Sequence, residues 1–126
     1  MQVVAGSDGE PRPVRGSGAF ILKSSSTVTS SFTTSVVEVL DCPWLAGFSV
    51  ATAGTGTNPT LTVAFQEGPT TDSFVNVGFV TLTSVTLSAK ISYPTGNGRY
   101  VRATAGSLGG TNPTFSAVQI IVIGKN

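Results

Sequence analysis

The sequence contains no histidine, one cysteine and few charged residues. Charged residues make up 10% of the 126-residue chain, whereas soluble domains usually contain about 25%. Without histidine, the chain lacks the most common general base and the most common metal ligand. The single cysteine, Cys42, can form no internal disulfide, which fits assembly in a reducing cytosol. Because no histidine can activate its thiol, we expect Cys42 to be a small buried side chain rather than a nucleophile.

Concentrated positive charge and long apolar runs are absent as well. The seven basic residues are scattered and the net charge is +1, so nucleic acid is not expected as a partner. No apolar run approaches the roughly 20 residues of a membrane helix, and the N-terminus lacks the basic start and long apolar stretch of a secretion signal. A membrane partner is therefore not expected. Low charge also removes a protection against association between sheet edges, so we expect the chain to pack against other subunits.

The sequence does have the residue alternation that is typical of β-strands. Residues 44–50 alternate in a pattern that predicts a strand with Trp44, Phe48 and Val50 facing the core. Residues 60–66 alternate in the same way, and the two strands are predicted to pair as a hairpin. No window shows helical periodicity, and about eight short strands separated by turns are expected. The pattern predicts one all-β domain over residues 19–126, an antiparallel β-sandwich of the jelly-roll-like or immunoglobulin-like kind.

A short repeat links two parts of the chain. Residues 54–63 and residues 106–115 each contain a glycine-rich turn, the sequence Thr-Asn-Pro-Thr and an apolar residue after it. Neither glycine-rich turn is followed by Lys-Ser/Thr or by a helix, so a phosphate-binding loop is excluded. Each asparagine is expected to be extended, because it precedes a proline. The two turns are predicted to lie at the same end of the sandwich.

Residues 1–18 differ from the rest of the chain, because they contain two prolines, four glycines and four of the thirteen charged residues. A frayed terminus is one interpretation. The preferred interpretation is an extended N-terminal arm that becomes ordered against a neighbouring subunit. The expected contact residues of the arm are its aliphatic and basic side chains: Val3, Val4, Arg12, Val14 and Arg15.

The candidate catalytic and ligand-binding residues are few. Glu38 and Glu67 are the carboxylate pair that a glycosidase would need, but solvated carboxylates at turns and strand ends explain the acidic residues better. No Asp-rich loop suggests calcium, and no catalytic residue, cofactor or metal site is predicted. Three aromatic residues (Trp44, Tyr93 and Tyr100) form a possible sugar-binding platform, although core packing is favoured for Trp44.

Two arginines stand close together in one predicted strand. Arg99 and Arg102 have opposite parity, so one guanidinium is expected on each face of the strand. A rim ion pair is favoured over a ligand contact for these side chains.

Three sequence segments together resemble small β-sandwich virion proteins of tailed bacteriophages, of the capsid decoration or cement type. The segments are TNPTLTV at residues 57–63, GRYVR at residues 98–102 and GTNPTF at residues 110–115. The resemblance extends over roughly residues 34–123 and leaves the arm outside it. It implies a structural role on the capsid exterior, with assembly in the host cytoplasm. It also implies the major capsid protein as partner and a homo-oligomer, with a trimer favoured.

The sequence therefore predicts a non-enzymatic capsid decoration protein that binds the assembled head and stabilises contacts between capsomers. The main alternative is a carbohydrate-binding or receptor-binding module of a phage tail or fibre, which requires exposed aromatic side chains on one face. A small hydrolase is the other alternative, and it requires two carboxylates that face each other in a cleft.

Overall fold

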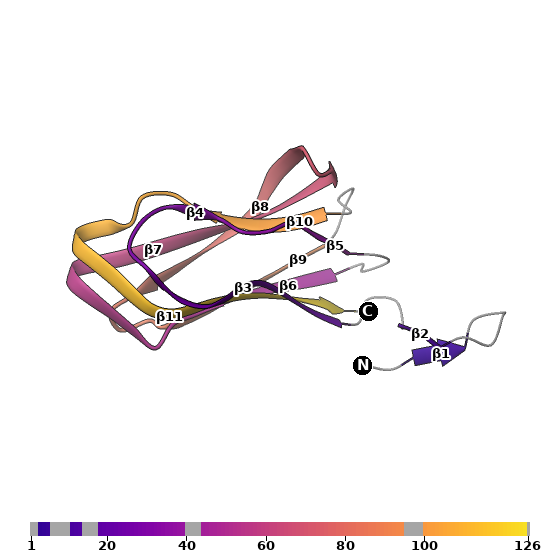
Figure 1. Ribbon diagram of the computed structural model, residues 1–126, viewed down its shortest axis with the longest axis horizontal. Coiled ribbons are helices and arrows are strands. Elements are labelled where there is room, and N and C mark those ends of the chain that lie inside the picture. The colour runs from indigo at the N-terminus through magenta and orange to yellow at the C-terminus, as the bar shows by residue number, and fades with distance from the viewer. Residues whose placement is uncertain (1–2, 6–10, 14–17, 40–43, 95–99, 126) are drawn as a thin grey trace.

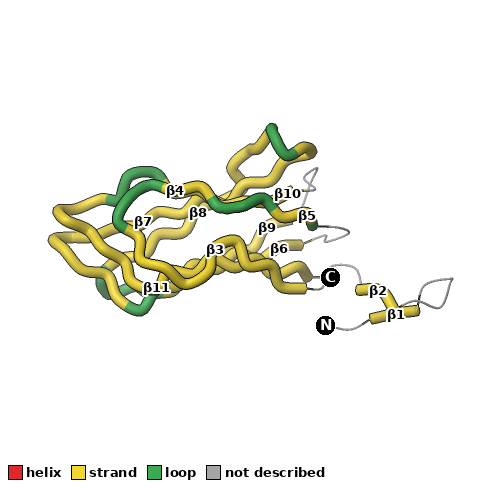
Figure 2. The backbone as a smooth tube through the Cα atoms, viewed as in Figure 1, coloured by secondary structure: helices red, strands yellow, loops and turns green. Residues whose placement is uncertain are grey.

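The computed structural model describes residues 3–5, 11–13, 18–39, 44–94 and 100–125. Short loops separate the strands, which make up nearly all of this part of the chain (Figure 2). The strands are β1 (Val3–Ala5), β2 (Pro11–Pro13), β3 (Gly18–Val28), β4 (Phe32–Thr33), β5 (Val37–Glu38), β6 (Trp44–Val50), β7 (Ala53–Thr70), β8 (Ser73–Thr83), β9 (Ser88–Pro94), β10 (Tyr100–Ala105) and β11 (Gly109–Lys125).

Strands β3 to β11 form one continuous antiparallel sheet that folds into two layers (Figure 1). In the first layer β8 pairs with β7, β7 with β10, and β10 with both β4 and β5. In the second layer β3 pairs with β11, β11 with β6, and β6 with β9. The long strands β7 and β11 pair with each other through their N-terminal halves and so join the layers at one end. This arrangement confirms the predicted all-β, antiparallel β-sandwich.

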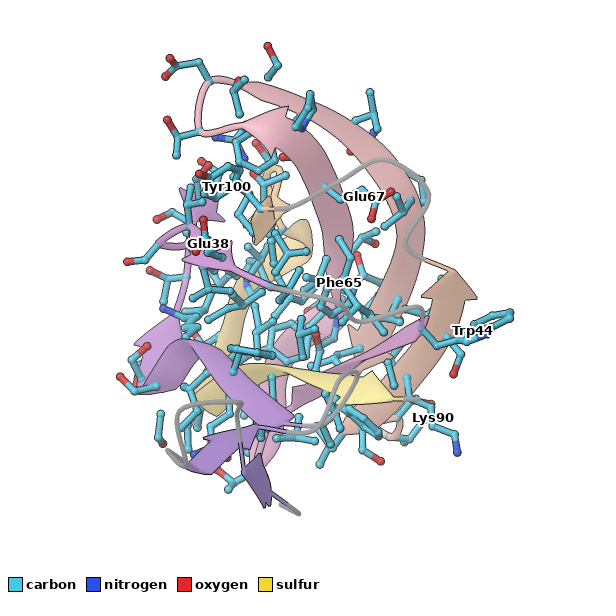
Figure 3. The ribbon with its side chains drawn as sticks, turned by 90° about the vertical axis from the view of Figure 1, so that its right-hand side faces the viewer. Glu38, Trp44, Phe65, Glu67, Lys90 and Tyr100 are labelled. Atoms are coloured by element: carbon cyan, nitrogen blue, oxygen red, sulfur yellow. The ribbon has the colours of Figure 1, made fainter. Side chains whose placement is uncertain are left out.

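The core lies between the two layers. Its largest fully buried side chains include Phe65 of β7, Phe115 of β11 and Leu45 of β6. A Cβ atom added at Gly47 of β6 would lie 2.7 Å from the Phe65 ring, so the glycine makes room for this ring. Strands β6 and β7 therefore face each other across the core (Figure 3). The prediction that they pair as a hairpin is wrong.

The predicted orientation of β6 is also wrong. Leu45 and Ser49 have no exposed surface, whereas Trp44 is 48% exposed. The strand thus turns Leu45, Gly47 and Ser49 inward. It presents Trp44 on the outside, as Figure 3 shows. Alternation failed here because both sets of side chains in β6 are largely apolar. The space required by Phe65 selects the inner set, since only small residues fit beneath the ring.

The two copies of the repeat lie side by side, which confirms the prediction that they share one end of the sandwich. Thr57 pairs with Thr111 in the β7–β11 ladder, and Thr55 pairs with Thr114. Asn58 and Asn112 have positive φ angles of 50° and 49°. The expectation of extended asparagines was therefore wrong. Asparagine tolerates the left-handed region better than most residues, and here the tight crossing of the strands requires it.

The N-terminal segment contains its own small sheet. β1 and β2 pair antiparallel, with Val4 opposite Arg12, and neither pairs with a strand of the sandwich. The described part of the arm is therefore a hairpin rather than a single extended strand. The sandwich begins with β3 at Gly18, one residue before the predicted boundary.

Candidate functional site

The two candidate carboxylates lie on opposite faces of one layer. Glu38 of β5 is the cross-strand partner of Tyr100, and Glu67 of β7 is the partner of Val101. Because consecutive residues of a strand point to opposite faces, Glu38 lies on the outer face and Glu67 on the inner face. Glu67 is accordingly buried, with 7% of its surface exposed, and Glu38 is exposed. Figure 3 shows Glu38 next to Tyr100 and Glu67 apart from both. The two carboxylates do not face each other across a cleft, so they do not have the geometry that the hydrolase alternative requires.

Among the described residues, the other candidate catalytic and metal-binding residues do not form a site with Glu38 or Glu67. Within the described residues, no group of three or more His, Cys, Asp or Glu side chains lies close enough to hold a metal ion. Cys42 and Arg99 lie outside the described residues. None of the described residues belongs to a helix long and apolar enough to cross a membrane.

The aromatic platform, the less favoured interpretation of Trp44, Tyr93 and Tyr100, is not formed. Trp44 lies in the second layer, on its outer side, and Tyr100 lies in the first layer on β10. Tyr93 belongs to β9, where it pairs with Leu45. Trp44 and Tyr100 therefore belong to different layers and do not share a face.

Arg102 instead belongs to a polar row on the outer face of the first layer. Its Nε donates a hydrogen bond to Oε1 of Gln66 at 2.8 Å. Nε2 of Gln66 donates in turn to Oδ1 of Asn76 at 2.8 Å. The guanidinium carbon of Arg102 lies 4.1 Å from the centre of the Phe74 ring. The partner of Arg102 among the described residues is therefore an amide and a ring, not the carboxylate that a rim ion pair needs.

Sequence reasoning missed Gln66, Phe74 and Asn76 as partners of this arginine. The pairing of Gln66 with Asn76 cannot be found by counting residues back from the β7–β8 pairs before it. A bulge in β8 shifts the register by one residue between the Phe65–Gly78 and Gln66–Asn76 pairs. A bulge leaves only a weak signal in sequence. The position of the bulge therefore could not be predicted from the sequence. The contacts of Arg102 that depend on it could not be predicted either.

The outer face of the second layer is largely apolar. Ile21 of β3, Ile121 of β11 and Phe48 of β6 are consecutive cross-strand neighbours in one row. Ile21 is 63% exposed, and Ile121 and Phe48 are partly exposed. We call this surface the apolar face and define it by these residues: Ile21, Trp44, Phe48, Val50, Ile121 and Ile123.

Two lysines pair with residues of the apolar face, Lys125 of β11 with Trp44 and Lys90 of β9 with Phe48. Lys90 of β9 is the next cross-strand neighbour of Phe48 and points away from the core (Figure 3). Lys23 of β3 does not join it, because its ammonium lies 4.8 Å from the centre of the Phe32 ring. The centre of the face is therefore an uninterrupted row of three apolar side chains, with one lysine at its end.

The predicted arm contacts are only partly described. Val3, Val4 and Arg12 lie in the β1–β2 hairpin, where Val3 pairs with Pro13 and Val4 with Arg12. Val14 and Arg15 lie outside the described residues.

No protein-family model and no curated protein sequence matches the chain. Solved structures with the same fold do match it. The PBSX exported protein XepA superimposes with a TM-score of 0.61 at 12% sequence identity, over 100% of this chain and 49% of XepA. The SPBc2 prophage-derived protein YomS gives a TM-score of 0.52 at 12% identity, over 89% of this chain and 96% of YomS. The chain thus spans about half the length of XepA and nearly all of YomS. At this identity, the likeness establishes the β-sandwich fold.

Proposed function

We propose that this chain is a non-enzymatic structural protein of a phage particle, of the capsid decoration type. It binds the exterior of the assembled head, with the major capsid protein as its partner, and stabilises contacts between capsomers. It does so as a homo-oligomer, for which a trimer is the favoured state.

The apolar face carries this proposal. Large contiguous apolar surfaces that are open to water commonly mark sites of protein association. Here Ile21 is 63% exposed and Trp44 48% exposed, on a sheet that carries Lys90 at the end of its apolar row. Each square ångström of apolar surface that is buried contributes about 25 cal/mol. Covering this face with another protein therefore contributes favourable free energy to association.

The context of a phage particle rests on similarity. The two solved structures described above are named as a PBSX protein and an SPBc2 prophage-derived protein. The sequence segments at residues 57–63, 98–102 and 110–115 resemble phage virion proteins as well. Both observations support a phage origin, and neither identifies the surface to which the chain attaches.

Co-sedimentation with cognate capsids tests the proposal. Replacing Ile21→Thr and Ile121→Thr together preserves β-branching and polarises the centre of the apolar face. We expect capsid occupancy to fall at least tenfold while melting is little changed. Val85→Ser is the matched control, because Val85 is 88% exposed and lies in the turn between β8 and β9, outside the apolar face. Wild-type occupancy of the double variant would contradict attachment through this face.

Glycan binding is the second candidate function. The polar row of Arg102, Gln66 and Asn76 favours it, together with Phe79, which is 58% exposed on the same strand as Asn76. This surface belongs to the first layer, so glycan binding and attachment through the apolar face are compatible.

A further inference from the structure

We propose that the outer face of β10, β7 and β8 binds an acidic glycan through a uronic acid residue. The carboxylate is held by Arg102, Gln66 and Asn76, and the sugar ring lies against Phe79. This inference rests on the glycan-binding candidate and names the class of ligand.

The first argument is that the polar row is held in place before any ligand arrives. Arg102 and Gln66 are cross-strand partners, as are Gln66 and Asn76, so the three side chains stand in one line across three strands. Two hydrogen bonds of 2.8 Å connect them. The Phe74 ring, 4.1 Å from the guanidinium carbon, supports the arginine from one side. A ligand that binds here does not have to order long, freely rotating side chains, which lowers the entropic cost of binding.

The second argument is the direction of these hydrogen bonds. The carbonyl oxygen of Gln66 already accepts a bond from Arg102, and that of Asn76 already accepts one from Gln66. The groups left over within the row are therefore N–H donors: the two terminal amino groups of Arg102, one N–H of Gln66 and the amide NH₂ of Asn76. No hydrogen bond among the described residues uses these donors. A carboxylate is an acceptor only, so it matches a row that presents donors. A sugar hydroxyl both donates and accepts hydrogen bonds, so a row that presents only donors satisfies it less completely than it satisfies a carboxylate.

The third argument is an exposed ring beside the donors. Phe79 pairs with Ala64, and Gln66 follows Ala64 two residues further along β7, on the same face. Residues at this spacing are about 7 Å apart. This separation suits one sugar residue whose ring contacts Phe79 and whose carboxylate reaches the row.

The charged residues near the polar row limit how much negative charge the ligand can carry. Arg102 is the positive charge of the row, whereas Glu38 lies on the same outer face opposite Tyr100 and Asp72 lies in the turn between β7 and β8. Glu67 lies on the inner face. Among the described residues, Arg102 is the guanidinium that would accommodate one carboxylate per sugar, and Asp72 would repel a densely charged polyanion.

The test uses matched pairs of ligands. Tetrasaccharides of galacturonic, glucuronic and mannuronic acid are titrated calorimetrically into the full chain, each beside its carboxyl-reduced form. We expect at least one acid to bind at least tenfold more tightly than its reduced form, and high salt to weaken that binding. Equal binding of both forms would overturn the carboxylate assignment and leave glycan binding in place. Binding of neither form would overturn both.

Variants locate the site. Phe79→Ser and Arg102→Met are expected to weaken binding of the acid at least tenfold, and Arg102→Lys, which keeps the charge but not the fork, is expected to restore it in part. Val85→Ser, an exposed apolar residue outside the face, serves as the control. Melting temperatures of all four proteins show whether a loss reflects unfolding. Undiminished binding by folded Arg102→Met and Phe79→Ser proteins would overturn the assignment of this face. Capsid occupancy of these variants is expected to be unchanged, which separates this site from the apolar face.

Discussion

Gly56 of β7 and Gly110 of β11 occupy equivalent positions in the two repeats, and each lies against the backbone of the other repeat. A Cβ atom at Gly56 would lie 2.6 Å from the carbonyl oxygen of Asn112, and one at Gly110 would overlap the carbonyl oxygen of Asn58. Both glycines have positive φ angles, 111° and 93° respectively. The repeat is thus a symmetric crossing of two strands. Here β7 and β11 approach each other closely enough to pass from one layer to the other.

Alanine at either glycine is expected to destabilise the fold. Gly56→Ala and Gly110→Ala each place a side chain in a disfavoured backbone conformation, which costs about 1–3 kcal/mol before any steric overlap. Each also forces the two strands apart. The free energy of unfolding from denaturant titration should therefore fall by at least this amount in both variants. Gly106→Ala is the control, because a Cβ atom there would have no neighbour within 4 Å. An equal loss in all three variants would show that the crossing is not the cause.

The orientation of β6 is tested by two adjacent residues. Leu45→Ala is expected to lower the free energy of unfolding by about 2–5 kcal/mol, because Leu45 is fully buried. Trp44→Ala should lower it by about 1 kcal/mol or less, because nearly half of the tryptophan is exposed. Denaturant titrations of both variants make the comparison. A larger loss for Trp44→Ala than for Leu45→Ala would restore the orientation that alternation predicted.

A buried hydroxyl provides a third prediction. Ser49 has no exposed surface, and its Oγ has no hydrogen-bond partner among the described residues. Burying a hydroxyl without a partner costs about 1–3 kcal/mol, so Ser49→Ala is expected to raise the free energy of unfolding by about 1 kcal/mol. The matched variant is Thr104→Ala, which removes a hydroxyl that donates to the carbonyl oxygen of Phe32 at 3.0 Å. That variant should be destabilised by about 1 kcal/mol. Destabilisation of Ser49→Ala would mean that its hydroxyl is hydrogen-bonded in solution.

The sequence predicted the fold class well because strand alternation and turns are local signals. β8 ends in such a turn at Thr83, where the backbone N–H of Thr83 donates to the carbonyl oxygen of Thr86 at 2.9 Å. The repeat correctly placed its two copies together at one end, although the structure has them in the paired strands β7 and β11 rather than in turns.

The candidate sites were less predictable because they depend on which strands are neighbours. Residues 44–50 are apolar on both faces, so only the contact of Gly47 with Phe65, from the opposite layer, decides which face is buried. The contact of Arg102 with Gln66 likewise depends on β10 lying beside β7, strands separated by β8 and β9 in the chain. Residue alternation carries no information on such pairings.

The N-terminal segment is expected to contribute to assembly rather than to the stability of the sandwich. β1 and β2 pair only with each other among the described strands, and an isolated two-stranded hairpin is marginally stable in water. We expect contact with another subunit to stabilise the hairpin, with Val3 and Val4 of β1 as its anchors. Deleting residues 1–17, which leaves β3 complete from Gly18, should therefore leave the melting temperature nearly unchanged and weaken oligomerisation or capsid attachment.

Analytical ultracentrifugation and capsid co-sedimentation of the truncated protein measure these effects, and Val3→Ser with Val4→Ser in the full chain tests the anchors without deletion. A large drop in melting temperature on truncation would mean that the segment packs on its own sandwich. Unchanged association and occupancy would mean that it takes no part in assembly. The apolar face around Ile21, Phe48 and Ile121 would then be the surface expected to hold the subunits together, because it presents an exposed apolar row across three strands.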